Sequence, residues 1–134
     1  MKNRTKWILG CIILVLMVMG LLLAFVSSVF GPSVESIVAR LNKIGVERIE
    51  QEAMELINAG KKDSLDPRDY PSAISKLRPH SVRVVDSELV VIVLKEFNGT
   101  SETGVYVYKD SSTPRRRNEL RPVTKTLAIY KMFD

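Results

Sequence analysis

The chain has few of the side chains on which most enzymes and metal sites depend. Its 134 residues include one cysteine, Cys11, and one histidine, His80. A zinc site usually takes about four Cys, His or carboxylate ligands, so we expect no metal site and no cofactor. A Ser–His or Cys–His catalytic pair would depend on His80 alone. The sequence also lacks the Gly-x-Ser-x-Gly, His-Glu-x-x-His, P-loop and Gly-x-Gly-x-x-Gly patterns.

Charge is absent from residues 7–30, where the only polar side chains are Ser27 and Ser28. As a helix, these 24 residues would extend roughly 36 Å, enough to cross a hydrocarbon core of about 30 Å. The apolar part of a cleavable signal peptide is shorter, about 7–15 residues. The best cleavage site would follow Ser28, and it is poor because valine stands where an Ala-x-Ala site has alanine. The sequence therefore predicts an uncleaved transmembrane signal anchor, with a signal peptide as the alternative.

The distribution of cations predicts the orientation of this span. Three cations lie within residues 1–6, whereas the first cation after the span is Arg40. The positive-inside rule then places the N-terminal tip in the cytoplasm and residues 31–134 outside it, on a single-pass protein of the cell membrane. Apart from the three cations of the tip, 17 basic and 15 acidic residues remain, so the exported part has no excess of charge that would indicate nucleic acid. It has no cysteine, and its folding must depend on a hydrophobic core.

Two stretches after the span have apolar residues at helical spacing, 34–44 and 46–57, and Gly45 separates them. Ser33 is suited to cap the first helix, and Gly60, which two lysines follow, is suited to end the second. The polar face of the second helix is largely acidic, which argues against a helix lying on anionic lipid. We expect the helices to pack on a core.

The pattern changes from helix to strand after Pro79. A third, short helix is expected over 70–77, and Asp86-Ser87-Glu88 predicts a hairpin turn. The second strand of this hairpin, 89–94, is apolar at every position, which is typical of a central strand. A loop is expected over 110–122. The expected strands are 81–85, 89–94, 104–109 and 124–130.

A characteristic order of motifs runs over about residues 70–110: Pro71-Ser72-Ala73-Ile74, Leu77 and Pro79, then SVRVVDSELVVIVLKEF and GVYVYKD. In this order the stretch resembles a group of small uncharacterised bacterial proteins of unknown function. In those proteins a short helix and a proline precede a hairpin, an aromatic–glycine step and a further strand. A Gly-rich segment often follows their second strand, and this chain has residues 95–100 there instead. The resemblance implies a fold and no activity.

Four arginines in one predicted loop, Arg115, Arg116, Arg117 and Arg121, form a candidate site for an anion or a partner. Guanidinium groups bind phosphate and carboxylate with paired hydrogen bonds, so such a cluster suits anionic head groups or acidic side chains. A solvated loop, partly neutralised by acidic residues nearby, is the alternative.

Small residues recur at every fourth position of the span, at Gly20, Ala24 and Ser28. This spacing lets two helices approach closely in lipid, so a homodimer through the transmembrane helix is a candidate assembly. Chance spacing in a span with several small residues is the alternative.

Together these features predict an α+β protein with an N-terminal transmembrane helix. A domain of two to three helices (33–77) precedes an antiparallel sheet of about four strands (81–131). The leading hypothesis is a non-catalytic interaction domain, an accessory subunit of an envelope complex, with the bilayer and another protein as partners. The alternative is a membrane-tethered enzyme that uses carboxylate or tyrosine chemistry with His80.

The predicted topology can be tested with a reporter enzyme that is active only after export. Fused after Asp134, the reporter should be active, and the mature protein should retain residues 1–30, because the span is too long for a cleaved signal peptide. A reporter that is active only in the cytoplasm, or N-terminal sequencing that begins near Val29, would contradict this topology.

Overall fold

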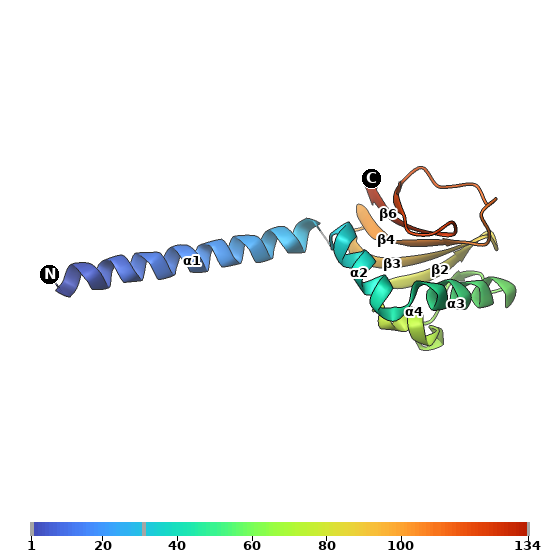
Figure 1. The fold of residues 1–134 in the computed structure, drawn as a ribbon, viewed down its shortest axis with the longest axis horizontal. Helices are drawn as coiled ribbons and strands as arrows, with labels where there is room; N and C mark the ends of the chain where they lie inside the picture. The colour runs from blue at the N-terminus through green and yellow to red at the C-terminus, as the bar shows by residue number, and fades with distance from the viewer. Residues whose placement is uncertain (1, 31, 134) are drawn as a thin grey trace. The chain divides into compact units, whose positions relative to one another are not determined.

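The computed structural model describes residues 2–30 and 32–133, and the side chains of residues 3–26 and 32–133. The chain divides into two compact units, Met1–Gly31 and Pro32–Asp134 (Figure 1). The first unit contains a single long helix, and the second contains the shorter helices and a sheet.

The long helix, α1, spans Lys2–Phe30. Within its segment Asn3–Val26, a window of 18 residues has a mean hydropathy of 3.0 and none of that window is buried. An exposed apolar helix of this length is stable where lipid replaces water around its side chains. The helix is therefore long and apolar enough to serve as a membrane anchor or as a signal sequence.

The helices of the second unit begin and end close to the predicted positions. Ser33 caps α2, since its side chain accepts a hydrogen bond of 3.2 Å from the backbone N–H of Ser36. Gly45 separates α2 from α3 with a φ of 107°, a conformation that favours glycine. Gly60 follows α3 with a φ of 68°, as expected for a residue that ends a helix. The helices are α2 (Val34–Ile44), α3 (Val46–Asn58), the 3-10 turn η1 (Pro67–Asp69) and α4 (Ser72–Lys76).

A buried carboxylate on α3 holds α4 in place. Glu52 accepts hydrogen bonds of 2.9 Å from the backbone N–H of Ala73 and 3.0 Å from that of Ile74. These N–H groups lie at the start of α4, where no partner exists within the helix, and a carboxylate also complements the helix dipole there. The short helix is thus fixed by a residue twenty positions earlier in the sequence.

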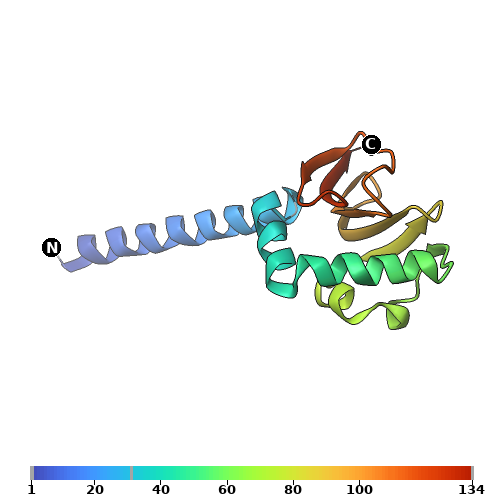
Figure 2. The ribbon, with the colours of Figure 1, turned by 45° about the vertical axis from the view of Figure 1, so that its right-hand side comes forward.

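The six strands form one antiparallel sheet in the order β1-β2-β3-β4-β6-β5. Helices α2, α3 and α4 lie on one face of this sheet (Figure 1, Figure 2). The predicted α+β class is therefore confirmed. The strands are β1 (Asp63–Ser64), β2 (Ser81–Val85), β3 (Leu89–Phe97), β4 (Ser101–Tyr108), β5 (Glu119–Pro122) and β6 (Leu127–Phe133).

The prediction of about four strands was wrong, because the sheet has six. The two additional strands, β1 and β5, are the edges of the sheet, and β5 lies inside the segment 110–122 predicted to be a loop. An edge strand pairs on one side only and stays largely exposed, so it does not need alternating apolar residues. A register shift between Glu119 and Arg121 and a proline at Pro122 further weaken the strand pattern of β5.

Both faces of the sheet are buried at its centre. The side chains of Val90 and Ile92 on β3 pack with the helices, whereas Leu89, Val91 and Val93 pack in a second cluster on the opposite face. The predicted central position of this strand is confirmed, since β3 pairs with β2 on one side and β4 on the other, and its first five residues are buried. Among the described residues of this unit, the helices lie on the opposite face from the second cluster, and the loop after β4 contacts this cluster at Tyr108 instead.

Gly104 on β4 lies where the backbones of β3 and β4 approach most closely. A Cβ atom at this position would be 2.1 Å from the carbonyl oxygen of Ile92, far inside van der Waals contact. The adjacent register of β3 shifts between Val93 and Lys95. Only glycine fits here without moving the backbone of the central strand.

Replacing Gly104 with alanine should lower the free energy of unfolding by about 3 kcal/mol, because the added methyl group meets backbone atoms that cannot move aside. The matched control, Ser101→Ala on the same strand, should stay within about 0.5 kcal/mol of the parent. Chemical denaturation of the full chain in detergent measures both. A Gly104→Ala variant as stable as the control would show that β3 and β4 separate easily at this point.

Candidate functional site

Three tyrosines dominate the sheet face that the helices leave open. The rings of Tyr106 and Tyr130 stack with centroids 3.9 Å apart and planes 7° from parallel. The ring of Tyr108 meets Tyr106 edge-on, with centroids 6.0 Å apart. All three tyrosines are buried, so their hydroxyl groups need hydrogen-bond partners within the protein.

Each of these hydroxyls donates to an acidic or amide side chain. Tyr130 donates to Glu102 over 2.5 Å, and Glu102 also pairs with the guanidinium of Arg83 at 2.8 Å. Tyr106 donates to Asn118 over 3.0 Å. Tyr108 donates to Glu119, likewise over 3.0 Å. The tyrosine face is thus fixed by polar contacts at its border.

These surroundings keep the phenols protonated. Burial is the main cause that raises the pKa of Tyr106, Tyr108 and Tyr130 above the usual value near 10. For Tyr130 the hydrogen bond to the Glu102 carboxylate raises the pKa further, because a phenolate there would face a second negative charge. The three tyrosines therefore act as neutral hydrogen-bond donors, and a shift in this direction does not suit a phenolate base or nucleophile.

Arg115 fastens the loop between β4 and β5 to the tyrosine face. Its guanidinium lies 4.4 Å from the centre of the Tyr108 ring and 3.6 Å from the Glu119 carboxylate. It also donates a hydrogen bond to the carbonyl oxygen of Lys125. With these three partners, Arg115 serves the structure of the loop.

Arg116 and Arg117 instead line a groove on the tyrosine face, which we call the arginine groove. Its volume is about 310 Å³, and a third cation, Arg83 of β2, also lines it. The side chain of Arg116 is within 3.9 Å of the exposed Asp86 carboxylate. Among the described residues, Arg117 has no hydrogen-bond or ion-pair partner. The other lining residues are Val85, Leu89, Val91, Tyr106, Asn118 and Met132.

The structure thus brings together two of the four arginines singled out in the sequence, Arg116 and Arg117. Arg121 lies on β5 and is not among the residues of the groove. Arg83 also lines the groove, although it was not among the predicted site residues. Along β2 it alternates with the buried residues Val82 and Val84, so its side chain faces away from the helix-covered core. This alternation in the sequence could have indicated that Arg83 lies on the open face.

His80 lies immediately before β2 and contacts a carboxylate. Its Nε2 is 3.3 Å from a carboxylate oxygen of Glu96, with 57% of the His80 side chain exposed. Glu96 and its cross-strand neighbour Glu102 line a small groove of about 200 Å³, together with Arg83. In the part of the chain that the structure describes, no group of three His, Cys, Asp or Glu residues could hold a metal ion.

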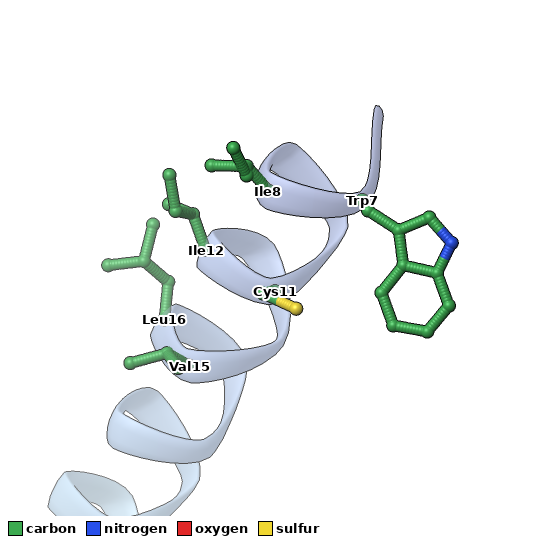
Figure 3. Close-up of a pocket in the computed structure, with 6 residues that line it drawn as sticks. All are labelled: Trp7, Ile8, Cys11, Ile12, Val15 and Leu16. Carbon is green, nitrogen blue, oxygen red and sulfur yellow. The ribbon is translucent and has the colours of Figure 1, made fainter. Parts of the chain in front are cut away.

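The surface of α1 is apolar around Cys11. A hollow of about 450 Å³ is bordered by Trp7, Ile8, Cys11, Ile12, Val15 and Leu16. Figure 3 shows Ile8, Ile12 and Leu16 along one side of the helix and Trp7 on the other side. Such a surface suits acyl chains. Gly20, Ala24 and Ser28 also lie in α1, and the association of two such helices stays a prediction.

No family model matches the chain, and no curated protein or solved structure matches it either.

The raised pKa values predict how the domain responds to alkali. Above pH 10 the unfolded chain would release phenolic protons that the folded domain retains, so the free energy of unfolding should fall as the pH rises. Phenolate absorbance from these three tyrosines should therefore appear together with the loss of circular dichroism. A Tyr130→Phe variant should lose less stability between neutral and alkaline pH than the parent. Ionisation of all three phenols near pH 10 in a folded domain would contradict the prediction.

Proposed function

We propose that the chain is a single-pass membrane protein whose second unit is a non-catalytic binding domain, an accessory subunit of an envelope complex. The arginine groove is its binding site. The partner is a protein segment that presents a carboxylate next to an apolar side chain. The observation that carries this proposal is the groove itself, in which three arginines line an apolar floor. Arg83 is paired with Glu102 and Arg116 lies near Asp86, whereas Arg117 has no ion-pair partner among the described residues.

The anchor and its orientation come from the first thirty residues. A helix of this hydropathy and length fits a bilayer, and the cations before it favour a cytoplasmic N-terminus. In this topology the binding domain, Pro32–Asp134, lies outside the cytoplasm. Tethering also raises the effective concentration of the domain near other membrane proteins.

The chemistry of the groove selects the partner. Guanidinium groups form paired, charge-assisted hydrogen bonds with carboxylates, and the partly desolvated setting strengthens them. The floor of Val85, Leu89, Val91 and Met132 offers contact area to an aliphatic or aromatic side chain. A volume of about 310 Å³ accommodates a few side chains of a peptide segment. Arg117, with no partner of its own in the described domain, is available for the ligand.

An enzyme that uses His80 is the second candidate, and one observation favours it. The contact of 3.3 Å between His80 and Glu96 is the geometry of an imidazole oriented by a carboxylate. Both side chains are substantially exposed, however, so solvent screens the pair and no site excludes water around it. The arginine groove has the better formed surface, and we prefer the binding function.

Photocrosslinking in the native membrane tests the proposal. A photoreactive residue in place of Met132, which lines the groove, should give a discrete crosslinked protein product. The yield should fall with rising salt, because the contact is partly Coulombic. Substituting Arg116→Ser and Arg117→Ser together should reduce the yield at least tenfold, since each charged hydrogen bond contributes about 1.5 kcal/mol.

The matched control is Arg121→Ser, which removes a nearby cation outside the groove and should leave the crosslink unchanged. Neither variant should shift the melting temperature much, because exposed charges contribute little to stability. Equal crosslinking in the double variant, or a product that contains lipid and no protein, would contradict the proposed partner.

A further inference from the structure

Two phenylalanines lie exposed at one end of the sheet, in a single cross-strand row. Phe97 of β3 pairs with Ser101 of β4, and Ser101 pairs with Phe133 of β6. Residues in register on neighbouring strands point to the same face, so both rings project from the same side. Phe97 is 40% exposed and Phe133 is 70% exposed.

The next row of the same face contains two lysines. Lys95 pairs with Thr103, and Thr103 pairs with Lys131. The Lys131 ammonium lies 5.0 Å from the centre of the Phe133 ring. We call these four side chains, Phe97, Phe133, Lys95 and Lys131, the Phe–Lys patch.

The Phe–Lys patch extends the helix-covered face of the sheet beyond its core. Ser101 and Thr103 share a face with Val105 and Val107, which belong to the core under the helices. Within the described residues 32–133, the exposed large apolar side chains are Phe97, Leu120 and Phe133. Two of these three therefore belong to one patch, which is more than the scattered exposure expected of a surface.

The composition of the patch is that of a membrane interface. Aromatic rings favour the boundary between lipid and water, and lysines place their ammonium groups near phosphates while their stems stay on apolar surface. Each lysine close to an anionic leaflet adds electrostatic attraction. An anionic head-group layer matches both the charge and the apolar character of the four side chains.

The link between the anchor helix and the domain is short. Only residues 31–33 separate the end of α1 at Phe30 from the start of α2 at Val34. Four steps of extended chain reach at most about 14 Å. Figure 1 shows that β4 starts and β6 ends at the same end of the sheet, and that α2 starts near this end.

We infer that the Phe–Lys patch docks on the anionic head-group layer of the membrane that holds α1. The inference goes beyond the proposed function and rests only on its anchor, since the patch and the arginine groove lie on opposite faces of the sheet. Docking adds a second attachment of the domain and limits its rotation about the short linker.

Spin labels on the full chain in nanodiscs test the inference. The background is Cys11→Ser, and the label is attached at Thr100→Cys in the β3–β4 turn or, as a control, at Ser111→Cys in the loop after β4. The lipid is a mixture of phosphatidylcholine and phosphatidylglycerol, and the measurement is collision with a water-soluble nickel complex. The label at residue 100 should be several-fold less accessible than the label at residue 111.

Two double variants identify which side chains of the Phe–Lys patch make the label at residue 100 inaccessible. Replacing both phenylalanines, Phe97→Ser with Phe133→Ser, should make the label at residue 100 as accessible as the control. Replacing both lysines, Lys95→Gln with Lys131→Gln, should do so in part. These side chains are exposed, so both variants should remain folded, and circular dichroism checks that they do.

The outcomes separate the inference from the anchor on which it rests. A chain that does not co-elute with nanodiscs would overturn the anchor. A chain that co-elutes but has equally accessible labels would overturn the docking alone. Dipolar broadening between labels at residue 100 would assign the patch to a second copy of the chain and would also overturn docking on lipid.

Discussion

Because β3 and β4 pair at the centre of the sheet, the rest of the domain must cover both faces of this pair. These strands carry apolar side chains on both faces, so the sheet must be covered twice. Helices α2, α3 and α4 cover one face, and Glu52 fixes α4 there through the backbone N–H groups of Ala73 and Ile74. The loop between β4 and β5 lies on the other face, where its polar backbone and its arginines contact the tyrosines.

The arginine groove follows from this second cover. A loop shields less of a sheet than a helix does, so part of the tyrosine face stays open as a groove. The buried phenols need hydrogen-bond acceptors, and two of the three acceptors, Glu102 and Glu119, are carboxylates. The carboxylates in turn attract Arg83 and Arg115. The cationic border of the groove is thus connected to the packing of the core through one network.

The same connection assigns different roles to neighbouring arginines. Arg115 is held by the Tyr108 ring, by Glu119 and by a backbone carbonyl, so its charge is already satisfied. Arg116 donates its backbone N–H to the Tyr108 hydroxyl, and its guanidinium lies 3.9 Å from the exposed carboxylate of Asp86, while the residue lines the groove. The run of arginines therefore separates into one residue that holds the loop, Arg115, and two that line the groove, Arg116 and Arg117. The folded loop, and no property of arginine itself, makes the distinction.

The sequence alone determined the anchor-like helix, the capping residues Ser33 and Gly45, and the central strand, because these depend on local composition and periodicity. It did not reveal β1 and β5, because an edge strand needs neither alternating apolar residues nor a high content of apolar residues. It named Arg116 and Arg117 but not Arg83, which is distant in the chain and reaches the groove only through the β2–β3–β4 pairing. The Phe–Lys patch likewise exists only through strand register, which brings together residues 97 and 133. Contacts between distant segments are decided by tertiary packing, and local pattern cannot encode them.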